Sequence, residues 1–369
     1  MTSEKQSILP EQDDADIRSI LRNFRSSKVW LPVLIGLGVV IYMITSSIDK
    51  AALDRIKWSP HTLGWLLAAI LFLLTRHFLY SVRLYLLADK KITIWKCIKL
   101  VVIWEFGTAI TPTALGGSAV FVFVLANEKL GTTRSLAAVL YSIILNTCFF
   151  IFSITFLLLI FGFNVIHPSF HSFNDNSQIG HTFLILFTVI TTYGLLFAFG
   201  LFVSPVQFKK LLMLITSIPF LKKYRDGAIK MGDEMITASN EIKSWPVSYH
   251  LKLFGLTLLA WACRFLIVNC LLIALVTNAN YHFYDQFKIF GRQVIMFIFM
   301  MFSPTPGASG FAEVFFGNFI GDYIPKSAAV IIALIWRFLT YYAYLIFGVI
   351  VLPQWLAGVM KKRREDRVI

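Results

Sequence analysis

Long apolar runs bounded by charged residues dominate this chain of 369 residues. About 20 apolar residues are enough for an α-helix to cross the hydrocarbon core of a bilayer. Six runs reach about that length, at 29–47, 63–87, 134–163, 181–203, 251–279 and 326–352. With 57% hydrophobic and 15% charged residues, the chain is too apolar for a water-soluble domain of its size. The sequence therefore predicts an all-α, polytopic helical membrane protein with about six full spans.

Two further apolar segments, at about 97–130 and 288–324, are interrupted by proline, glycine and hydroxyl residues. The interruptions read TPTALGG at 111–117 and SPTPGASG at 303–310. Proline ends a helix because it lacks the amide donor and clashes with the preceding turn. Inside a bilayer such backbone is tolerated only where protein or a water-filled cavity covers it. We therefore expect two re-entrant, broken-helix hairpins.

The two broken segments are related by a constant offset of 192 residues, counted from Pro112 to Pro304 and from Arg134 to Lys326. The positive-inside rule orients the first hairpin toward the cytoplasm and the second toward the outside. Inverted repeats whose broken helices meet at mid-membrane are typical of alternating-access transporters. The alternative is a chance similarity between apolar segments.

Basic residues cluster between and after the spans, and these clusters set the orientation. They account for the net charge of +14, so anionic lipid head groups are the expected partner and nucleic acid is not. The predicted parts are a polar cytoplasmic tail (1–28), a transmembrane domain (29–355) with a cytoplasmic amphipathic segment (206–250), and a basic cytoplasmic tail (356–369). This places both termini in the cytoplasm and the chain in a bacterial-type inner membrane.

Charged residues at membrane depth are costly and are expected to face a cavity or a partner. Arg76, Arg264 and Arg337 fall at similar depths on three predicted spans. Guanidinium groups bind phosphate bidentately, and half-helices restarting at about Gly117 and Ser309 would present amide groups to an anion. The predicted substrate-binding residues are Arg76, Arg83, Glu105, Thr111, Pro112, Gly116, Gly117, Arg264, Pro304, Pro306, Gly307, Gly310, Glu313 and Arg337.

Glu105 and Glu313 sit on opposite sides of the two breaks. They could pair with the arginines, contact an amine on the substrate, or carry a proton. The alternative is that these two carboxylates and the three arginines form only structural ion pairs. No His, Cys or Asp cluster has metal-site spacing, and no cofactor is expected. The HExxH, GxSxG and P-loop patterns are absent, which favours a transporter over an enzyme.

The stretch 111–117 followed by LAAV at 136–139, and SPTPGASGFAE at 303–313 followed by Trp336-Arg337, resemble the two hallmark stretches of a known family. It is the lysylphosphatidylglycerol synthase transmembrane region family, also called flippase-like or UPF0104-type. The resemblance covers about residues 30–355. It implies translocation of a lipid, typified by aminoacylated phosphatidylglycerol, while some relatives are associated with lipid-linked glycans.

Two departures from the family pattern bear on the substrate. The soluble aminoacyl-transferase domain of bifunctional members is not seen, so synthesis of the lipid is not expected. The acidic and basic residues usual after the first Gly-Gly are replaced by SAVF at 118–121, which argues against a cationic head group.

The leading hypothesis is a lipid translocase that holds a phosphate-bearing head group between the two hairpins. Its partner would be a phospholipid or a lipid-linked substrate, and homo-oligomerisation stays open. The alternatives are an integral-membrane transferase or accessory protein acting on polyprenyl-phosphate-linked sugars, and a scaffold for an envelope complex.

Overall fold

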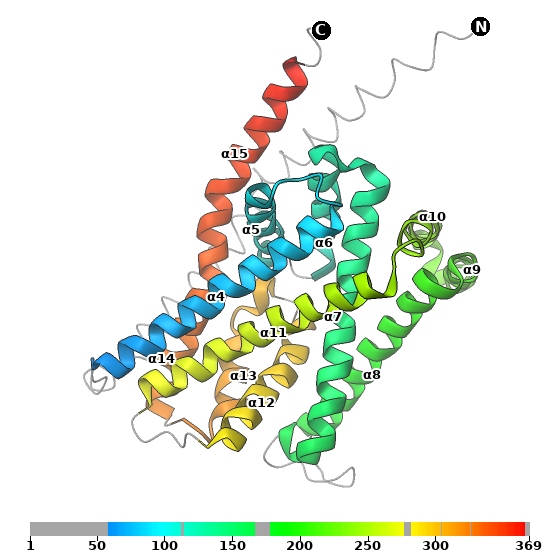
Figure 1. The fold of residues 1–369 in the computed structure, drawn as a ribbon. Helices are drawn as coiled ribbons and strands as arrows, with labels where there is room; N and C mark the ends of the chain where they lie inside the picture. Colours follow the sequence, from blue (N-terminus) through cyan, green and yellow to red (C-terminus); the bar gives the residue numbers. More distant parts are fainter. Residues whose placement is uncertain are drawn as a thin grey trace, which may run out of the picture.

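The computed structural model describes residues 58–111, 114–166, 178–276, 282–303, 305–324 and 326–365, and these form helices and connections without a strand (Figure 1). Five helical stretches there are long and apolar enough to cross a membrane: Pro60–Leu87, Gly131–Val165, Gln178–Val203, Val247–Leu275 and Ala328–Lys361. The prediction of an all-α polytopic membrane protein is confirmed. The predicted span 29–47 lies outside the described residues, so the count of six spans stays a prediction.

The helices follow one another with short connections. In chain order the α-helices are α4 (Pro60–Leu87), α5 (Ile94–Ile110), α6 (Ala114–Leu125), α7 (Gly131–Phe161), α8 (Gln178–Ala198), α9 (Pro205–Ile215), α10 (Arg225–Ile242), α11 (Val247–Leu275), α12 (Phe283–Met301), α13 (Phe311–Ile320), α14 (Lys326–Arg337) and α15 (Ala343–Glu365). Three short π-helices are η1 (Ala126–Leu130), η3 (Phe199–Val203) and η6 (Phe338–Tyr342), and three 3-10 turns are η2 (Gly162–Val165), η4 (Pro219–Tyr224) and η5 (Pro306–Ala308). The described spans start within about one helical turn of their predicted positions.

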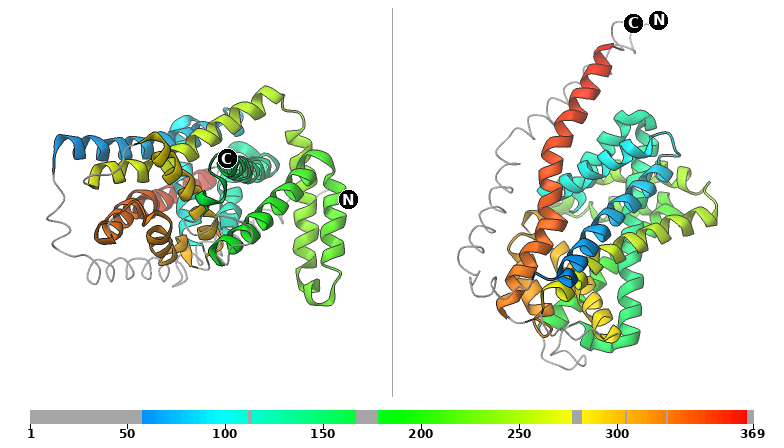
Figure 2. Two further views of the ribbon diagram at one scale, coloured as in Figure 1. Left: turned by 90° about the horizontal axis from the view of Figure 1, so that it is seen from below. Right: turned by 60° about the vertical axis from the view of Figure 1, so that its left-hand side comes forward.

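Helices α4 and α11 lie side by side and antiparallel, and they pack together more extensively than any other pair in the described part (Figures 1 and 2). Helix α4 begins where its sequence says it should: Pro60 opens the first turn, and the Ser59 hydroxyl accepts a hydrogen bond from the amide of Thr62 (3.2 Å). Near the other end of α4, Arg83 bonds to Thr257 in the first half of α11. The antiparallel pair forms one wall of the site described below.

The first broken segment folds back on itself at Thr111, where α5 ends and α6 follows in close contact. Gly117 makes this contact close, because a Cβ atom there would lie 2.6 Å from the Thr108 amide nitrogen. A methyl group would force the two backbones apart. The predicted restart at about Gly117 is wrong by about one turn, because α6 already begins at Ala114.

The second broken segment consists of α12, the turn η5 and α13. Gly307 (φ 57°) and Gly310 (φ 85°) adopt left-handed backbone that side chains disfavour, so helix α12 cannot run on into α13. Helix α13 consequently begins at Phe311, not at the predicted Ser309. Both segments have the helix–turn–helix shape that a re-entrant hairpin requires, and their depth in the bilayer stays a prediction.

Two hydrophobic clusters form the interior. One is centred on α5, α6 and the first half of α7, and the other on α11, α12, α13 and the second half of α7. The predicted amphipathic segment 206–250 holds the helix pair α9–α10, which projects from the side of the bundle (Figure 2). Its inner face buries Met235, Ala238 and Ile242. The broken segments thus belong to different cores and face each other across the space between them.

Candidate functional site

A cavity of about 510 Å³ lies between the two broken segments. Thr111 lines it from the first break, and Ser303, Thr305 and Gly307 line it from the second. The remaining walls come from α4, α7, α8, α11 and the end of α14. Its charged lining residues are Arg76, Arg83, Arg264, Arg337 and Glu105. Four guanidinium groups and one carboxylate make this an anion-favouring cavity inside an apolar protein.

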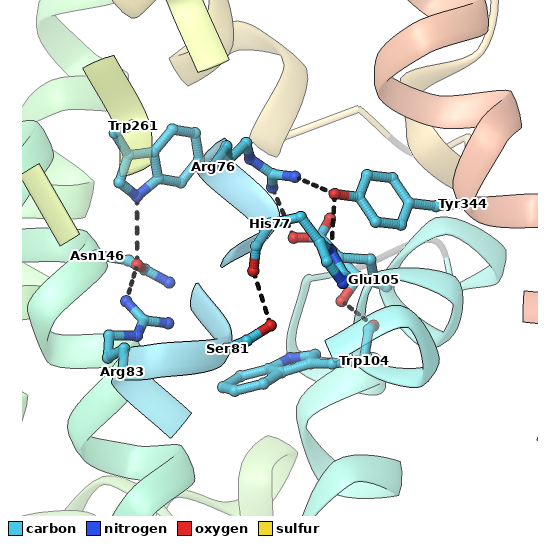
Figure 3. Close-up of polar contacts among 10 residues, drawn as sticks. Arg76, His77, Ser81, Arg83, Trp104, Glu105, Asn146, Trp261 and Tyr344 are labelled. Atoms are coloured by element: carbon cyan, nitrogen blue, oxygen red, sulfur yellow. Dashed lines mark hydrogen bonds and ion pairs between the residues drawn. The ribbon is translucent and has the colours of Figure 1, made fainter. Parts of the chain in front are cut away.

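Arg76 is buried near the middle of α4 and pairs with Glu105 of α5, with Nη2 2.6 Å from Oε1 (Figure 3). Its Nη1 also donates to the Tyr344 hydroxyl (2.9 Å), which lies within 3.3 Å of His77 Nδ1. Glu105 and Tyr344 come from two different helices. Arg76 therefore ties α4 to the first broken segment and to α15.

Arg83 lies two turns further along α4 and is 4% exposed. Its Nη1 donates to Asn146 Oδ1 and to Thr257 Oγ1, each at 3.0 Å. Trp261 donates from its indole nitrogen to the same Asn146 oxygen (3.2 Å, Figure 3). All of these partners are neutral, so the positive charge of Arg83 is solvated by dipoles and has no counter-charge among the described residues.

Arg264 of α11 is held by aromatic rings. Its guanidinium carbon lies 5.4 Å from the centroid of Trp261 and 5.0 Å from that of Phe297. Within the described ranges it makes no hydrogen bond or ion pair. It is the cavity arginine whose donors are most available to a ligand.

Arg337 and Glu313 form the ion pair of the second half, with Arg337 Nε 3.2 Å from Glu313 Oε1 and side chains only 3% and 2% exposed. Arg337 Nη2 also donates to the carbonyl oxygen of Gly307 (2.7 Å). Glu313 Oε2 accepts from the amide of Gly310 (2.7 Å) and so caps the start of α13. Together these contacts tie the turn of the second break to α13 and to the end of α14.

The two breaks are joined through Tyr341. Its hydroxyl donates to the carbonyl oxygen of Ala109, at the end of α5 (3.3 Å), and its ring lies under the Arg337 guanidinium (4.2 Å). A free carbonyl at the end of a broken helix needs such a donor inside a membrane. One side chain thus connects the C-terminal end of α5 to the turn η5.

The predicted site residues are only partly brought together. Arg76, Arg83, Glu105, Thr111, Arg264, Gly307 and Arg337 line the cavity. Pro306, Gly310, Glu313 and Gly117 do not line it but support the two breaks. Of Gly116 the structure gives only its place in α6, and Pro112 and Pro304 lie outside the described residues. One alternative was that two carboxylates and three arginines form only structural ion pairs. Four of these five charges are paired in the described residues, and Arg264 is not.

The sequence did not point to Asn146, Tyr344 or Arg292, although each is buried or contacts an arginine. Arg292 bonds to Asp322 (2.9 Å) and to the carbonyl oxygen of Phe319, away from the cavity. Its place in an apolar segment was a signal that could have been used. Asn146 and Tyr344 gave no such signal, because neutral polar residues are common in membrane helices. No group of His, Cys, Asp or Glu able to hold a metal ion occurs in the part of the chain that the structure describes.

The model of one known family matches residues 29–348, most of the chain: the lysylphosphatidylglycerol synthase TM region. The chain belongs to this family. It is also similar to a UPF0104 membrane protein of Archaeoglobus fulgidus, with 25% identity over 340 residues that cover 86% of this chain and 95% of the relative. No solved structure matches the chain. The resemblance seen in the two proline-containing stretches is therefore confirmed, and the chain is an integral, multi-pass membrane protein.

Proposed function

We propose that the protein is a lipid translocase that moves a phosphate-bearing head group across the cytoplasmic membrane through the cavity between its two broken segments. The observation that carries this proposal is the cavity itself, which places four arginines and one glutamate between the breaks. Guanidinium groups bind phosphate in bidentate geometry, with two parallel hydrogen bonds. With the two breaks at mid-membrane, as the inverted repeat predicts, a head group held between them would be halfway between the leaflets, which a translocase requires.

The arrangement of helices supports an inverted repeat. Helix α4 and then a broken segment open the first half, and α11 and then a broken segment open the second. The lead helices α4 and α11 are of nearly equal length, 28 and 29 residues, and run in opposite directions (Figure 1). Opposite orientation of two similar halves gives alternating access to a site between them. In this proposal both termini and the α9–α10 pair lie on the cytoplasmic side.

Partly exposed apolar residues in the cavity lining also support a lipid as the substrate. Val189, Met301 and Phe302 line the cavity and are 48%, 37% and 46% exposed. The cavity lining thus includes apolar side chains that other described residues do not cover. A head group inside can keep its acyl chains outside, which a soluble substrate does not need.

A leaflet-exchange assay tests the proposal. The purified protein is placed in liposomes that contain a head-group-labelled phospholipid, and the fraction quenched from outside is followed with time. We expect exchange above that of empty liposomes, and a loss of about tenfold or more for Arg264→Gln. Lys252→Gln, an exposed lysine on the same helix, is the charge-matched control and keeps its exchange. Exchange equal to that of empty liposomes for every anionic lipid tested refutes a translocase.

A further inference from the structure

The positive charges around the cavity exceed the negative ones. Arg76 pairs with Glu105 and Arg337 with Glu313, whereas Arg83 and Arg264 have no carboxylate partner within the described ranges. The described part of the site therefore keeps two uncompensated positive charges. An unpaired charge inside a membrane protein is unfavourable and is the usual mark of a ligand site.

The two halves explain why Arg264 is unpaired. Arg76 lies 11 residues before the end of α4, and Arg264 lies 11 residues before the end of α11. Counted from the ends of the antiparallel lead helices α4 and α11, the two arginines occupy corresponding positions; they are 188 residues apart, four fewer than the offset of 192 between the broken segments. One of them has a carboxylate partner and the other does not.

The position at which a carboxylate partner of Arg264 would be expected can be identified from the sequence. Glu105 lies seven residues before Pro112 of the first break, and Phe297 lies seven residues before Pro304 of the second. Arg76 contacts Glu105 at 2.6 Å, and Arg264 lies over the ring of Phe297 at 5.0 Å. The same position thus holds a carboxylate in one half and an aromatic ring in the other. The ring stabilises the arginine by a cation–π contact but leaves its charge and its donors unused.

We propose that the site selects lipids whose phosphate carries two negative charges, a phosphomonoester or a diphosphate, and that Arg264 with Arg83 supplies the matching charges. This inference rests on the proposed function and names its substrate class. A phosphodiester lipid carries one negative charge, whereas a phosphomonoester carries close to two above its second pKa of about 6. Only the phosphate with two negative charges neutralises both free guanidinium groups, those of Arg83 and Arg264.

The apolar lining of the cavity also indicates which of two ligands it binds, a lipid or free inorganic phosphate. Its lining is largely apolar, and Val189, Met301 and Phe302 in it are 48%, 37% and 46% exposed. Inorganic phosphate gains nothing from these residues, whereas acyl chains do. The ligand is therefore the lipid form of the dianion.

Binding to the purified full-length protein in detergent tests the proposal with three probes at pH 8. Dioleoyl phosphatidic acid is the dianionic lipid, dioleoyl phosphatidylglycerol is the monoanionic lipid with the same chains, and inorganic phosphate is the free anion. We expect phosphatidic acid to bind at least about tenfold more tightly than either of the others. Equal affinity for the two lipids, or no binding of either, overturns the charge selectivity. Inorganic phosphate binding as tightly as phosphatidic acid overturns the lipid part.

Variants at one position separate charge from packing. Phe297→Glu restores the ion pair of the other half, and we expect it to lower phosphatidic acid affinity about tenfold or more, to the level of phosphatidylglycerol. Phe297→Gln introduces a side chain of nearly the same size as glutamate without the charge, and its preference for phosphatidic acid stays. If Phe297→Glu does not fold, Arg264→Gln removes the same charge from the other side and is expected to have the same effect. A preference that survives in the folded Phe297→Glu or Arg264→Gln protein overturns the assignment of Arg264.

The two proposals fail in different ways. If the protein binds phosphatidic acid selectively but exchanges no lipid between leaflets, the charge selectivity stands and the translocase is refuted. If the protein exchanges phosphatidic acid and phosphatidylglycerol at equal rates and binds them equally, the translocase stands and the selectivity for two negative charges is refuted.

Discussion

Gly307 lies against the ring of Tyr341, so that a Cβ atom built on Gly307 would come within 1.9 Å of Tyr341 Cε2. The ring cannot easily move away, because its hydroxyl is bonded to Ala109 and its face is covered by Arg337. Gly307 also has a φ of 57°, where an L side chain is strained. Two independent requirements therefore call for glycine at this turn.

Gly307→Ala is expected to destabilise the protein by about 2–5 kcal/mol, from left-handed strain and overpacking together. Thermal unfolding in detergent, followed by a thiol-reactive dye that reports exposure of the native cysteines, measures the loss. Gly227→Ala is the control, because Gly227 lies in α10 and a Cβ atom added there would meet no other atom within 4 Å. There the change stabilises the helix by up to about 1 kcal/mol. Equal unfolding midpoints for Gly307→Ala and the wild type would contradict the packing described.

Glu313→Gln is expected to cost about 3–5 kcal/mol, because it leaves the buried Arg337 charge without a partner. The glutamine can still accept from the Gly310 amide, so the loss reports the charge and not the cap. The double variant Glu313→Gln/Arg337→Gln removes both charges and should be less destabilised than the sum of the two single variants. A double-mutant cycle on unfolding midpoints measures this coupling. Strict additivity would show that the pair contributes no interaction of its own.

Sequence reasoning found the elements of this fold because membrane spans are recorded in local hydrophobicity and prolines mark breaks. The spans starting at Pro60 and Val247, for example, follow from composition alone. The contacts between distant segments were not recorded in this way. Nothing in the sequence says that Tyr341 would reach Ala109, or that Arg264 would lie over the ring of Phe297, because such contacts depend on how the helices cross.

The site shows the same division. Charged residues stand out in an apolar run, so the place of Arg76, Arg264 and Arg337 at the cavity could be predicted. Their partners could not be assigned, because pairing depends on how each helix is rotated about its axis. Glu105 pairs with Arg76, whereas Arg83 donates a hydrogen bond to the side-chain amide oxygen of Asn146. Glu313 was placed in the site by its charge, yet the structure puts it behind the turn as a helix cap.

Glu105→Gln is expected to raise the affinity of the cavity for anionic lipids, because it releases the Arg76 guanidinium as a third free cation. Arg76 keeps its hydrogen bond to Tyr344, so the loss of stability should stay near 1–3 kcal/mol, roughly that of one charged hydrogen bond. Binding of phosphatidylglycerol and phosphatidic acid to the purified variant measures the effect. Lys252→Gln, an exposed change on α11 outside the cavity lining, serves as the control. A folded Glu105→Gln protein with weaker lipid binding would mean that Glu105 contacts the substrate, as it would with an amine-bearing head group.

Thiol labelling of intact cells tests the orientation on which alternating access depends. The four native cysteines are buried or half-buried, so they give a low background. Trp58 is 70% exposed just before α4, and Arg225 is exposed at the start of α10. With the basic α9–α10 pair in the cytoplasm, Trp58→Cys is expected to react with a membrane-impermeant maleimide from outside, and Arg225→Cys only after the cells are opened. Because both positions belong to one chain of spans, the opposite result at both would invert the whole map and would place the lysine-rich pair outside. Labelling of both from the same side would show instead that the number of crossings between α4 and α10 differs from the three assigned here to α4, α7 and α8.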